Sequence, residues 1–375
     1  MMTTVLIVLT LVLAFSNGAN DVSKGIATLV GSGVTNYKRA LVWGTLWTVA
    51  GGLAAAFASQ GLVAAFSGKD LLAQPLTGHA FLISVAGGAI LWLLAACLTG
   101  LPVSTTHAIT GALGGAGIMA IRLGGIEWIA LGKKFAMPLL VSPLLSMALM
   151  LLLFPLIRYT VGRFQKYCVC MERGQGVCIR LDPNASAAVA VVEAPIWVQP
   201  IVGQSQECES EPAVFLGINA LDALHWLTSG LTSFARGLND TPKILALGVA
   251  AASLAGLNQL EMYALVAFAM GLGSFWWGLR VTETLAAKVT PMSAEEGFSA
   301  NLITSALVGF ASYIALPVST THVSSGAIMG IGMRKGGKDI RWRTVKDMFW
   351  AWIVTLPAAA IFAMGLYALI SGGRI

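Results

Sequence analysis

The sequence carries little charge. Only 11% of its 375 residues are Asp, Glu, Lys or Arg, whereas 57% are hydrophobic. This balance excludes a soluble chain and predicts a polytopic membrane protein with the lipid bilayer as its surroundings. In a soluble protein a net charge of +6 would suggest nucleic-acid binding, but here the basic residues gather at the ends of apolar segments. We therefore expect no nucleic-acid partner and interpret these residues as topology signals.

Cysteine is also scarce, and no paired Cys-x-x-Cys ligand set occurs. Four of the five cysteines lie in one polar stretch: Cys168, Cys170, Cys178 and Cys208. They could bind zinc or an iron-sulfur cluster, but without paired ligands a loop of reduced thiols is the favoured interpretation, and we expect no cofactor. The apolar start lacks a small-residue cleavage site, which predicts a retained helix rather than a signal peptide.

A repeated hexapeptide organises the chain. Pro102-Val-Ser-Thr-Thr-His107 recurs as Pro317-Val-Ser-Thr-Thr-His322. A second pair of segments, Phe15 to Lys24 and Phe234 to Lys243, shares Phe, Gly, Asn, Asp and Lys at matching positions. The two motifs occur in the same order in both places, which indicates an internal duplication. Both motifs interrupt apolar stretches, where polar groups are costly and usually functional.

The apolar runs predict an all-α fold built from two repeats. Each repeat contains a broken helix, a span, a hairpin with the hexapeptide at its tip and a final span. In the first repeat these are 3–31 (broken at 16–21), 39–59, 79–121 and 135–157, and in the second 213–256, 261–279, 297–333 and 347–371. The second arm of the first hairpin is shorter than the roughly 20 residues of an ordinary span. The domains are therefore a first transmembrane repeat over 1–157, a polar loop over 158–212 and a second transmembrane repeat over 213–375.

The number of crossings sets the orientation of the repeats. A hairpin that returns to its own side leaves three net crossings per repeat, so the second repeat is inverted. Inverted repeats whose broken helices and hairpins meet near the membrane midplane are typical of secondary transporters. With the N-terminus outside, most Lys and Arg residues lie inside, although the basic residues of 122–134 do not. We expect a multi-pass cell-membrane protein with both termini outside and the loop 158–212 in the cytoplasm.

The hydroxyl-rich hexapeptides suit an oxyanion. Hydroxyl groups beside the start of a helix, together with its free backbone N–H groups, bind such anions without a full positive charge. The alternative is that these side chains only cap the helices and pack them together. The candidate donors are Ser104, Thr105, Thr106, Ser319, Thr320 and Thr321.

Acidic groups inside apolar stretches indicate a cation or proton site. Asp21 and Asp240 each follow an asparagine, Asn20 or Asn239, whose carbonyl oxygen suits a hard cation. The alternative is an ion pair within each motif, because a lysine follows each aspartate by three residues. His107 and His322, which end the hexapeptides, are more often hydrogen-bonded structural groups than proton carriers.

Several motifs together resemble the inorganic phosphate transporter (PiT) family. They are Gly18-Ala-Asn-Asp-Val22, the two hexapeptides and Arg280-Val-Thr-Glu-Thr284. The resemblance implies a symporter of inorganic phosphate that is coupled to sodium or protons and is often a homodimer. It assigns the two Asn-Asp pairs to the substrate and cation site, the hexapeptide hydroxyls to the phosphate cradle, and Glu283 to an acidic position of the family.

The sequence departs from the family at two matching positions. Lys24 and Lys243 stand where the family commonly has asparagine. An ammonium group there occupies space that a coupling cation would share, so we expect the lysines to contact the anion and to reduce or replace sodium coupling.

Three other functions fit parts of the pattern. A permease for sulfate or another oxyanion would use the same hydroxyl donors, and an anion channel is compatible with inverted broken helices. A membrane-embedded metal enzyme is disfavoured, because each duplicated motif holds a single histidine and the cysteines are not duplicated. We expect a transporter that imports phosphate by alternating access, not an enzyme.

Overall fold

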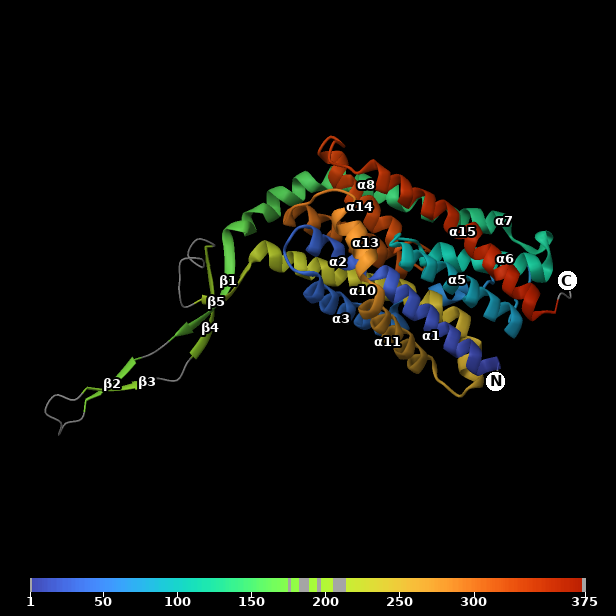
Figure 1. Ribbon diagram of the computed structural model, residues 1–375, viewed down its shortest axis with the longest axis horizontal. Coiled ribbons are helices and arrows are strands. Elements are labelled where there is room, and N and C mark those ends of the chain that lie inside the picture. Colours follow the sequence, from blue (N-terminus) through green and yellow to red (C-terminus); the bar gives the residue numbers. More distant parts are fainter. Residues whose placement is uncertain (1, 175–176, 182–188, 194–196, 205–213, 373–375) are drawn as a thin grey trace. The chain divides into compact units, whose positions relative to one another are not determined.

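The computed structural model describes the whole chain except residues 1, 175–176, 182–188, 194–196, 205–213 and 373–375 (Figure 1). Two compact units are formed, one from Met1–Pro155 with His225–Ile375 and the other from Leu156–Leu224. Within the described residues, 6 helical segments are long and apolar enough to cross a membrane. They are Met2–Gly31, Tyr37–Ala58, His79–Thr99, Trp128–Lys166, Gln259–Trp277 and Trp342–Ile370. The predicted helical membrane protein is confirmed.

The first half follows the predicted order of helices. The long helices are α1 (Met2–Asp21), α2 (Ser23–Gly31), α3 (Tyr37–Ala58), α5 (His79–Thr99), α6 (Thr105–Ile121) and α8 (Met137–Val161). Shorter pieces are α4 (Gln60–Phe66), η1 (Leu123–Gly125), α7 (Trp128–Ala130) and η2 (Leu131–Ala136). The break between α1 and α2 is confined to Val22, which keeps helical dihedral angles of φ −55 and ψ −32. The predicted break at 16–21 is therefore wrong, because α1 stays helical through Asp21 and the polar motif lies within helical backbone.

The second half contains α10 (Ala220–Leu254), α11 (Gln259–Trp277), α12 (Leu279–Ala287), α13 (Ala294–Tyr313), α14 (Thr320–Arg334) and α15 (Trp342–Ile370). The predicted break in the segment 213–256 is wrong, because α10 is continuous through Asn239 and Asp240. Asn and Asp end helices when their side chains bond the local backbone. Here the amide of Asn239 bonds Thr320 and the Val318 carbonyl instead, so the helix continues.

Strands occur in the unit Leu156–Leu224, which begins with the last turns of α8 and η3 (Gly162–Lys166). The strands β4 (Trp197–Gln204), β1 (Tyr167–Gly174) and β5 (Val214–Asn219) form an antiparallel sheet in that order. A second pair joins β2 (Val177–Leu181) to β3 (Val189–Glu193). A polar loop without strands was expected here, although runs of valine and isoleucine favour strands. Cys168 is disulfide-bonded, contrary to the reduced loop that we expected.

The unit of Met1–Pro155 with His225–Ile375, here called the membrane unit, contains two groups of packed helices that share α5. Helix α1 contacts α5 on one side and α11 on another, while α6, α5 and α15 pack against one another (Figure 1). Backbones meet directly where α1 crosses α11, since a Cβ atom on Gly18 would clash with the Met270 carbonyl and one on Gly273 with the Phe15 carbonyl. Glycine at such a seam permits the close approach that favours helix association in lipid. The seam places the Asn-Asp motif of α1 against a fixed neighbour.

Candidate functional site

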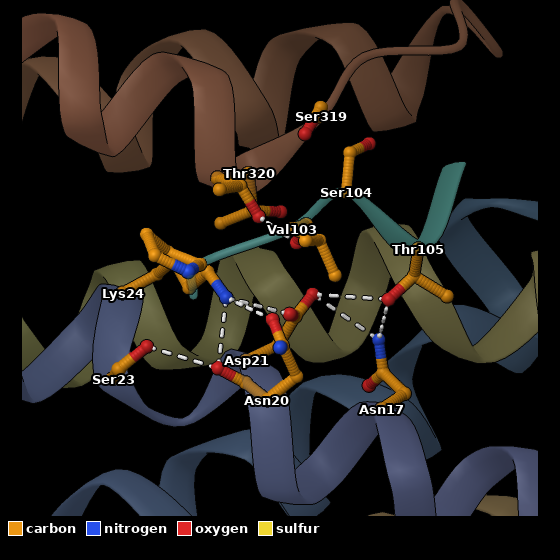
Figure 2. Close-up of polar contacts among 12 residues, drawn as sticks. Asn17, Asn20, Asp21, Ser23, Lys24, Val103, Ser104, Thr105, Ser319 and Thr320 are labelled. Atoms are coloured by element: carbon orange, nitrogen blue, oxygen red, sulfur yellow. Dashed lines mark hydrogen bonds and ion pairs between the residues drawn. The ribbon is translucent and has the colours of Figure 1, made fainter. Parts of the chain in front are cut away.

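The duplicated motifs meet in the interior of the membrane unit. The end of α1 and the start of α2 supply the first Asn-Asp motif, and the middle of α10 supplies the second. The hexapeptides begin α6 and α14, whose first turns face this cluster (Figure 2). Among the predicted residues, those of both Asn-Asp motifs and both hexapeptides are buried: Asn20, Asp21, Lys24, Ser104, Thr105, Thr106, Asn239, Asp240, Lys243, Ser319, Thr320 and Thr321. Two sequence motifs that lie far apart along the chain therefore form one cluster.

The two serines cap the helices that follow them. The Ser104 hydroxyl oxygen accepts a hydrogen bond from the backbone nitrogen of His107 at 3.2 Å, and that of Ser319 accepts one from His322 at 3.3 Å. Both serines therefore act as helix caps, which is one part of the alternative interpretation, and anion binding by their hydroxyl groups stays a prediction. A cap uses the oxygen as an acceptor, so the hydroxyl hydrogen stays free to bond an anion.

Two threonines join the hexapeptides reciprocally. Thr106 donates to the Val318 carbonyl at 3.1 Å, and Thr321 donates to the Val103 carbonyl at 2.8 Å. Each hairpin tip therefore holds the other by the same kind of bond, as the duplication would require. These hydroxyls are engaged in packing, which matches the alternative that part of the motif joins the helices.

One amide connects the two aspartates. The side-chain nitrogen of Asn17 lies 3.2 Å from an oxygen of Asp21 and 3.2 Å from an oxygen of Asp240. It also donates to the Thr105 hydroxyl at 2.9 Å. Two carboxylates from different repeats are thereby drawn to the same donor. Such a pair can share a cation or a proton.

Each aspartate is paired with its lysine. The Lys24 ammonium lies 2.7 Å from Asp21 and bonds both the side-chain and the backbone oxygen of Asn20 at 2.7 and 2.8 Å. The Lys243 ammonium lies 3.4 Å from Asp240 but makes shorter bonds to the Thr106 hydroxyl, 2.8 Å, and the Val318 carbonyl, 2.7 Å. The predicted ion pairs are present. They differ, because Lys24 stays within its own motif whereas Lys243 reaches the opposite hexapeptide.

The asparagines of the motifs bond the hexapeptide loops. Asn20 donates to the Leu101 carbonyl at 3.3 Å, and Asn239 donates to the Val318 carbonyl at 3.3 Å and to the Thr320 hydroxyl at 3.4 Å. The carbonyl oxygen of Asn20 accepts from Lys24, and that of Asn239 accepts from Ser312 at 3.3 Å. Both amides thus hold a hexapeptide in place beside the aspartates.

Glu283 lies elsewhere. Its side chain is exposed on α12, and in the part of the chain that the structure describes it has no hydrogen bond or ion pair with the cluster.

The rings of His107 and His322 are in contact at a centroid distance of 4.7 Å with an angle of 52° between their planes, and a ring nitrogen of His322 lies 3.0 Å from the Leu139 carbonyl oxygen. Both rings line a largely apolar cavity of about 320 Å³ next to α8 and α15. The histidines therefore serve as packing groups behind the hexapeptides.

Sequence reasoning missed Asn17 and Arg236. The two residues occupy matching positions of the duplicated segments, three places before each asparagine of the Asn-Asp pairs. Both are fully buried, and Arg236 is one of the largest fully buried side chains in the described part of the protein. Both positions already lie inside the aligned segments Phe15 to Lys24 and Phe234 to Lys243, and they form the one non-identical position there that is polar in both copies, which is the signal that could have found them.

Comparisons with known proteins agree with this architecture. A sequence model of the phosphate transporter family matches residues 17–363. A Pyrococcus horikoshii protein named as a phosphate permease is 28% identical over 95% of this chain and 96% of its own length. The chloroplastic inorganic phosphate transporter 2-1 of Arabidopsis thaliana is 26% identical over 94% of this chain and 69% of its own length. The solved structure of a sodium-dependent phosphate transporter superposes with a TM-score of 0.77 over 99% of both chains, at 22% identity, which shows a common fold.

Proposed function

Because the chain belongs to the phosphate transporter family, we propose that it is a secondary transporter that imports inorganic phosphate across the cytoplasmic membrane in symport with a cation. The proposal includes alternating access, in which the buried cluster opens to one side of the membrane at a time. The two repeats, 1–157 and 213–375, are inverted relative to each other, with both termini outside and the loop 158–212 in the cytoplasm. The working unit is a homodimer.

The observation that carries the proposal is the convergence of two capped helix starts on one buried polar cluster. The first turns of α6 and α14 present backbone N–H groups and the positive ends of their helix dipoles. Ser104 and Ser319 stand at these two starts on facing loops (Figure 2). Such paired helix starts favour a tetrahedral oxyanion between them. The Ser104 and Ser319 hydroxyls form the phosphate cradle, with Asn20 and Asn239 holding the loops around it. The threonine hydroxyls of the hexapeptides join the cradle in states in which Thr106 and Thr321 release the Val318 and Val103 carbonyls.

The aspartates support phosphate over sulfate. Phosphate at neutral pH carries at least one proton, and its O–H group needs an acceptor, whereas sulfate has none to donate. Asp21 and Asp240 are buried acceptors drawn together by the amide of Asn17. A site built to accept a substrate O–H rejects an analogue that lacks it, because the acceptor is then left unpaired. Sulfate is therefore the discriminating competitor.

The lysines favour protons, or few sodium ions, as the coupling cation. The solved relative is named as sodium-dependent. In this chain Lys24 and Lys243 already contact the aspartates that would hold such an ion. When phosphate arrives it competes for the ammonium groups and releases the carboxylates, which then take up a proton or a sodium ion. Glu283, exposed on α12, is a second cation contact in states in which α12 moves inward.

Uptake of labelled phosphate into proteoliposomes tests the function. Purified protein is reconstituted and uptake is followed with a sodium gradient, with an inward proton gradient and with neither. We expect accumulation above the external phosphate concentration that requires a cation gradient and that excess sulfate does not suppress. Uptake that only equilibrates phosphate would indicate a channel, and uptake blocked by sulfate would indicate a general oxyanion permease.

A further inference from the structure

Arg236 is a buried cation in the interior of the membrane unit. It stands one helical turn before Asp240 on α10, and its side chain is only 1% exposed. None of its three guanidinium nitrogens has a hydrogen-bond partner among the residues that the structure describes. A guanidinium group carries five N–H donors and stays charged in proteins. A buried charge in this condition is strongly unfavourable unless a ligand completes it.

The nearby carboxylates do not satisfy this group. Asp21 and Asp240 attract Arg236 electrostatically, but neither accepts a hydrogen bond from it. One oxygen of Asp21 bonds Lys24 and the other bonds Asn17. One oxygen of Asp240 bonds Asn239 and Lys243, and the other bonds Asn17. The two carboxylates therefore attract Arg236 electrostatically, but their oxygens accept hydrogen bonds from other donors.

The charges of the cluster leave one positive charge in excess. Lys24 balances Asp21, and Lys243 balances Asp240, through the two ion pairs. The charge of Arg236 is then uncompensated within the described part of the cluster. A buried excess of one sign favours a ligand of the other sign, so this arrangement is matched to an anion.

The duplication shows which way this position faces. Arg236 occupies the place that Asn17 has in the first copy. The amide of Asn17 is directed at the Thr105 hydroxyl and at both aspartates, which is the side of α1 that faces the hexapeptides. The matching position of α10 carries a longer, charged donor. The two copies therefore differ at this position. The amide of Asn17 joins Asp21 and Asp240, whereas the guanidinium of Arg236 has no hydrogen bond to either aspartate.

We propose that the guanidinium of Arg236 binds the transported phosphate directly, through paired N–H donors to two of its oxygens. This inference rests on the proposed function and names the group that recognises the charge of the anion. A planar guanidinium fits two oxygens of a phosphate with two parallel bonds, which a lysine ammonium cannot match. Ser104 and Ser319 then complete the cradle from the helix starts, and the lysine ammonium groups are those that the arriving anion draws away from the aspartates.

Binding of inorganic phosphate to purified protein in detergent tests this assignment. Affinity is measured by calorimetry both with and without sodium, together with the rise in melting temperature that phosphate causes. R236Q should bind phosphate about tenfold more weakly or worse, because charge-assisted bonds are lost. The same phosphate concentration should then raise its melting temperature less than that of wild type. R236K should keep the charge but bind more weakly than wild type. R334Q, which removes an arginine paired with Glu296 at the end of α14, is the control and should bind normally.

The outcomes separate this inference from the proposed function. A wild-type protein that binds no phosphate would overturn the function. If wild type binds phosphate and R236Q binds it equally well, with a lowered melting temperature that phosphate still raises, Arg236 is a structural counter-charge and the inference is wrong. Should R236Q fail to fold, R236K decides, since phosphate affinity equal to that of wild type would contradict binding by a guanidinium fork.

Discussion

The ammonium group of Lys243 lies 2.8 Å from the hydroxyl oxygen of Thr106, although the two residues are 137 positions apart in the sequence. The same hydroxyl donates to the Val318 carbonyl at 3.1 Å, and the ammonium group bonds that carbonyl too, at 2.7 Å. A closed triangle of bonds therefore joins α10, the start of α6 and the loop before α14. The matching residue of the first repeat, Lys24, makes no such crossing in the described structure.

This asymmetry predicts different effects for two equivalent threonines. T106A removes an acceptor from a buried ammonium group, which should cost about 1.5–3 kcal/mol, whereas T321A removes a neutral bond to a carbonyl and should cost about 0.5–1.5 kcal/mol. The free energy of unfolding in detergent, measured with a denaturant series, compares them. Equal losses for the two variants would show that the contact of Lys243 with Thr106 does not contribute.

Replacement of the capping serines tests the cradle. S104A and S319A should each weaken phosphate binding by about 1–3 kcal/mol, the usual loss for an unmade bond to a charged group. Each also loses a helix cap, which costs about 1 kcal/mol of stability. S293A is the matched control, because Ser293 caps α13 in the same way, accepting from Glu296 at 3.3 Å, outside the cluster. If S104A and S319A only lower stability as S293A does, the serines are caps alone.

The orientation of the chain is tested by cysteine labelling. On a cysteine-free background, a cysteine at the exposed position of Lys338 should react with a membrane-impermeant thiol reagent only after the cytosolic face is opened. The basic residues of 334–346 predict this location. A cysteine at the exposed position of Lys133 is the control and should react in intact cells. Labelling of the 338 variant from outside would overturn the proposed topology.

The lysines make a prediction about ion coupling. K24N alone should impair transport, because it leaves a buried aspartate without its partner. The double variant K24N/K243N restores the family's residue at both places and removes both ion pairs, so phosphate uptake should become sodium-dependent or more steeply so. Initial rates in proteoliposomes at graded sodium concentrations measure this. A wild type that requires sodium as steeply as the double variant would show that the lysines do not replace a coupling ion.

The sequence was informative wherever the duplication repeated a polar motif. It predicted the order of helices, the hairpins and the lysine-aspartate pairs, because polar groups at matching places in apolar segments need partners near each other. The sequence did not predict that Asn17 bonds both Asp21 and Asp240, because no sequence pattern indicates which distant residue an asparagine inside a helix will contact. The assignment of the hydroxyls and Arg236 to phosphate stays a prediction.

Two features were beyond sequence patterns for physical reasons. The continuity of α10 depends on partners outside the helix, since Asn239 bonds the Val318 carbonyl and Asp240 accepts from Asn17 of α1, which is a tertiary effect. The choice between capping and packing among neighbouring hydroxyls depends on which carbonyl lies opposite, as with Thr106 and Val318. The local sequence shows which hydroxyl groups can donate hydrogen bonds, but it does not show which carbonyl groups accept them in the folded protein.

The glycine seam between α1 and α11 constrains how the protein can move. Backbone touches backbone at Gly18 and Gly273, so the two helices lack at these points a side-chain layer through which they could slide past one another. We infer that α1 and α11 move together as one rigid body when access alternates, and that the hinges lie at the ends of this helix pair. A covalent link between the helices along this seam should then leave uptake intact, and its arrest by such a link would contradict the inference.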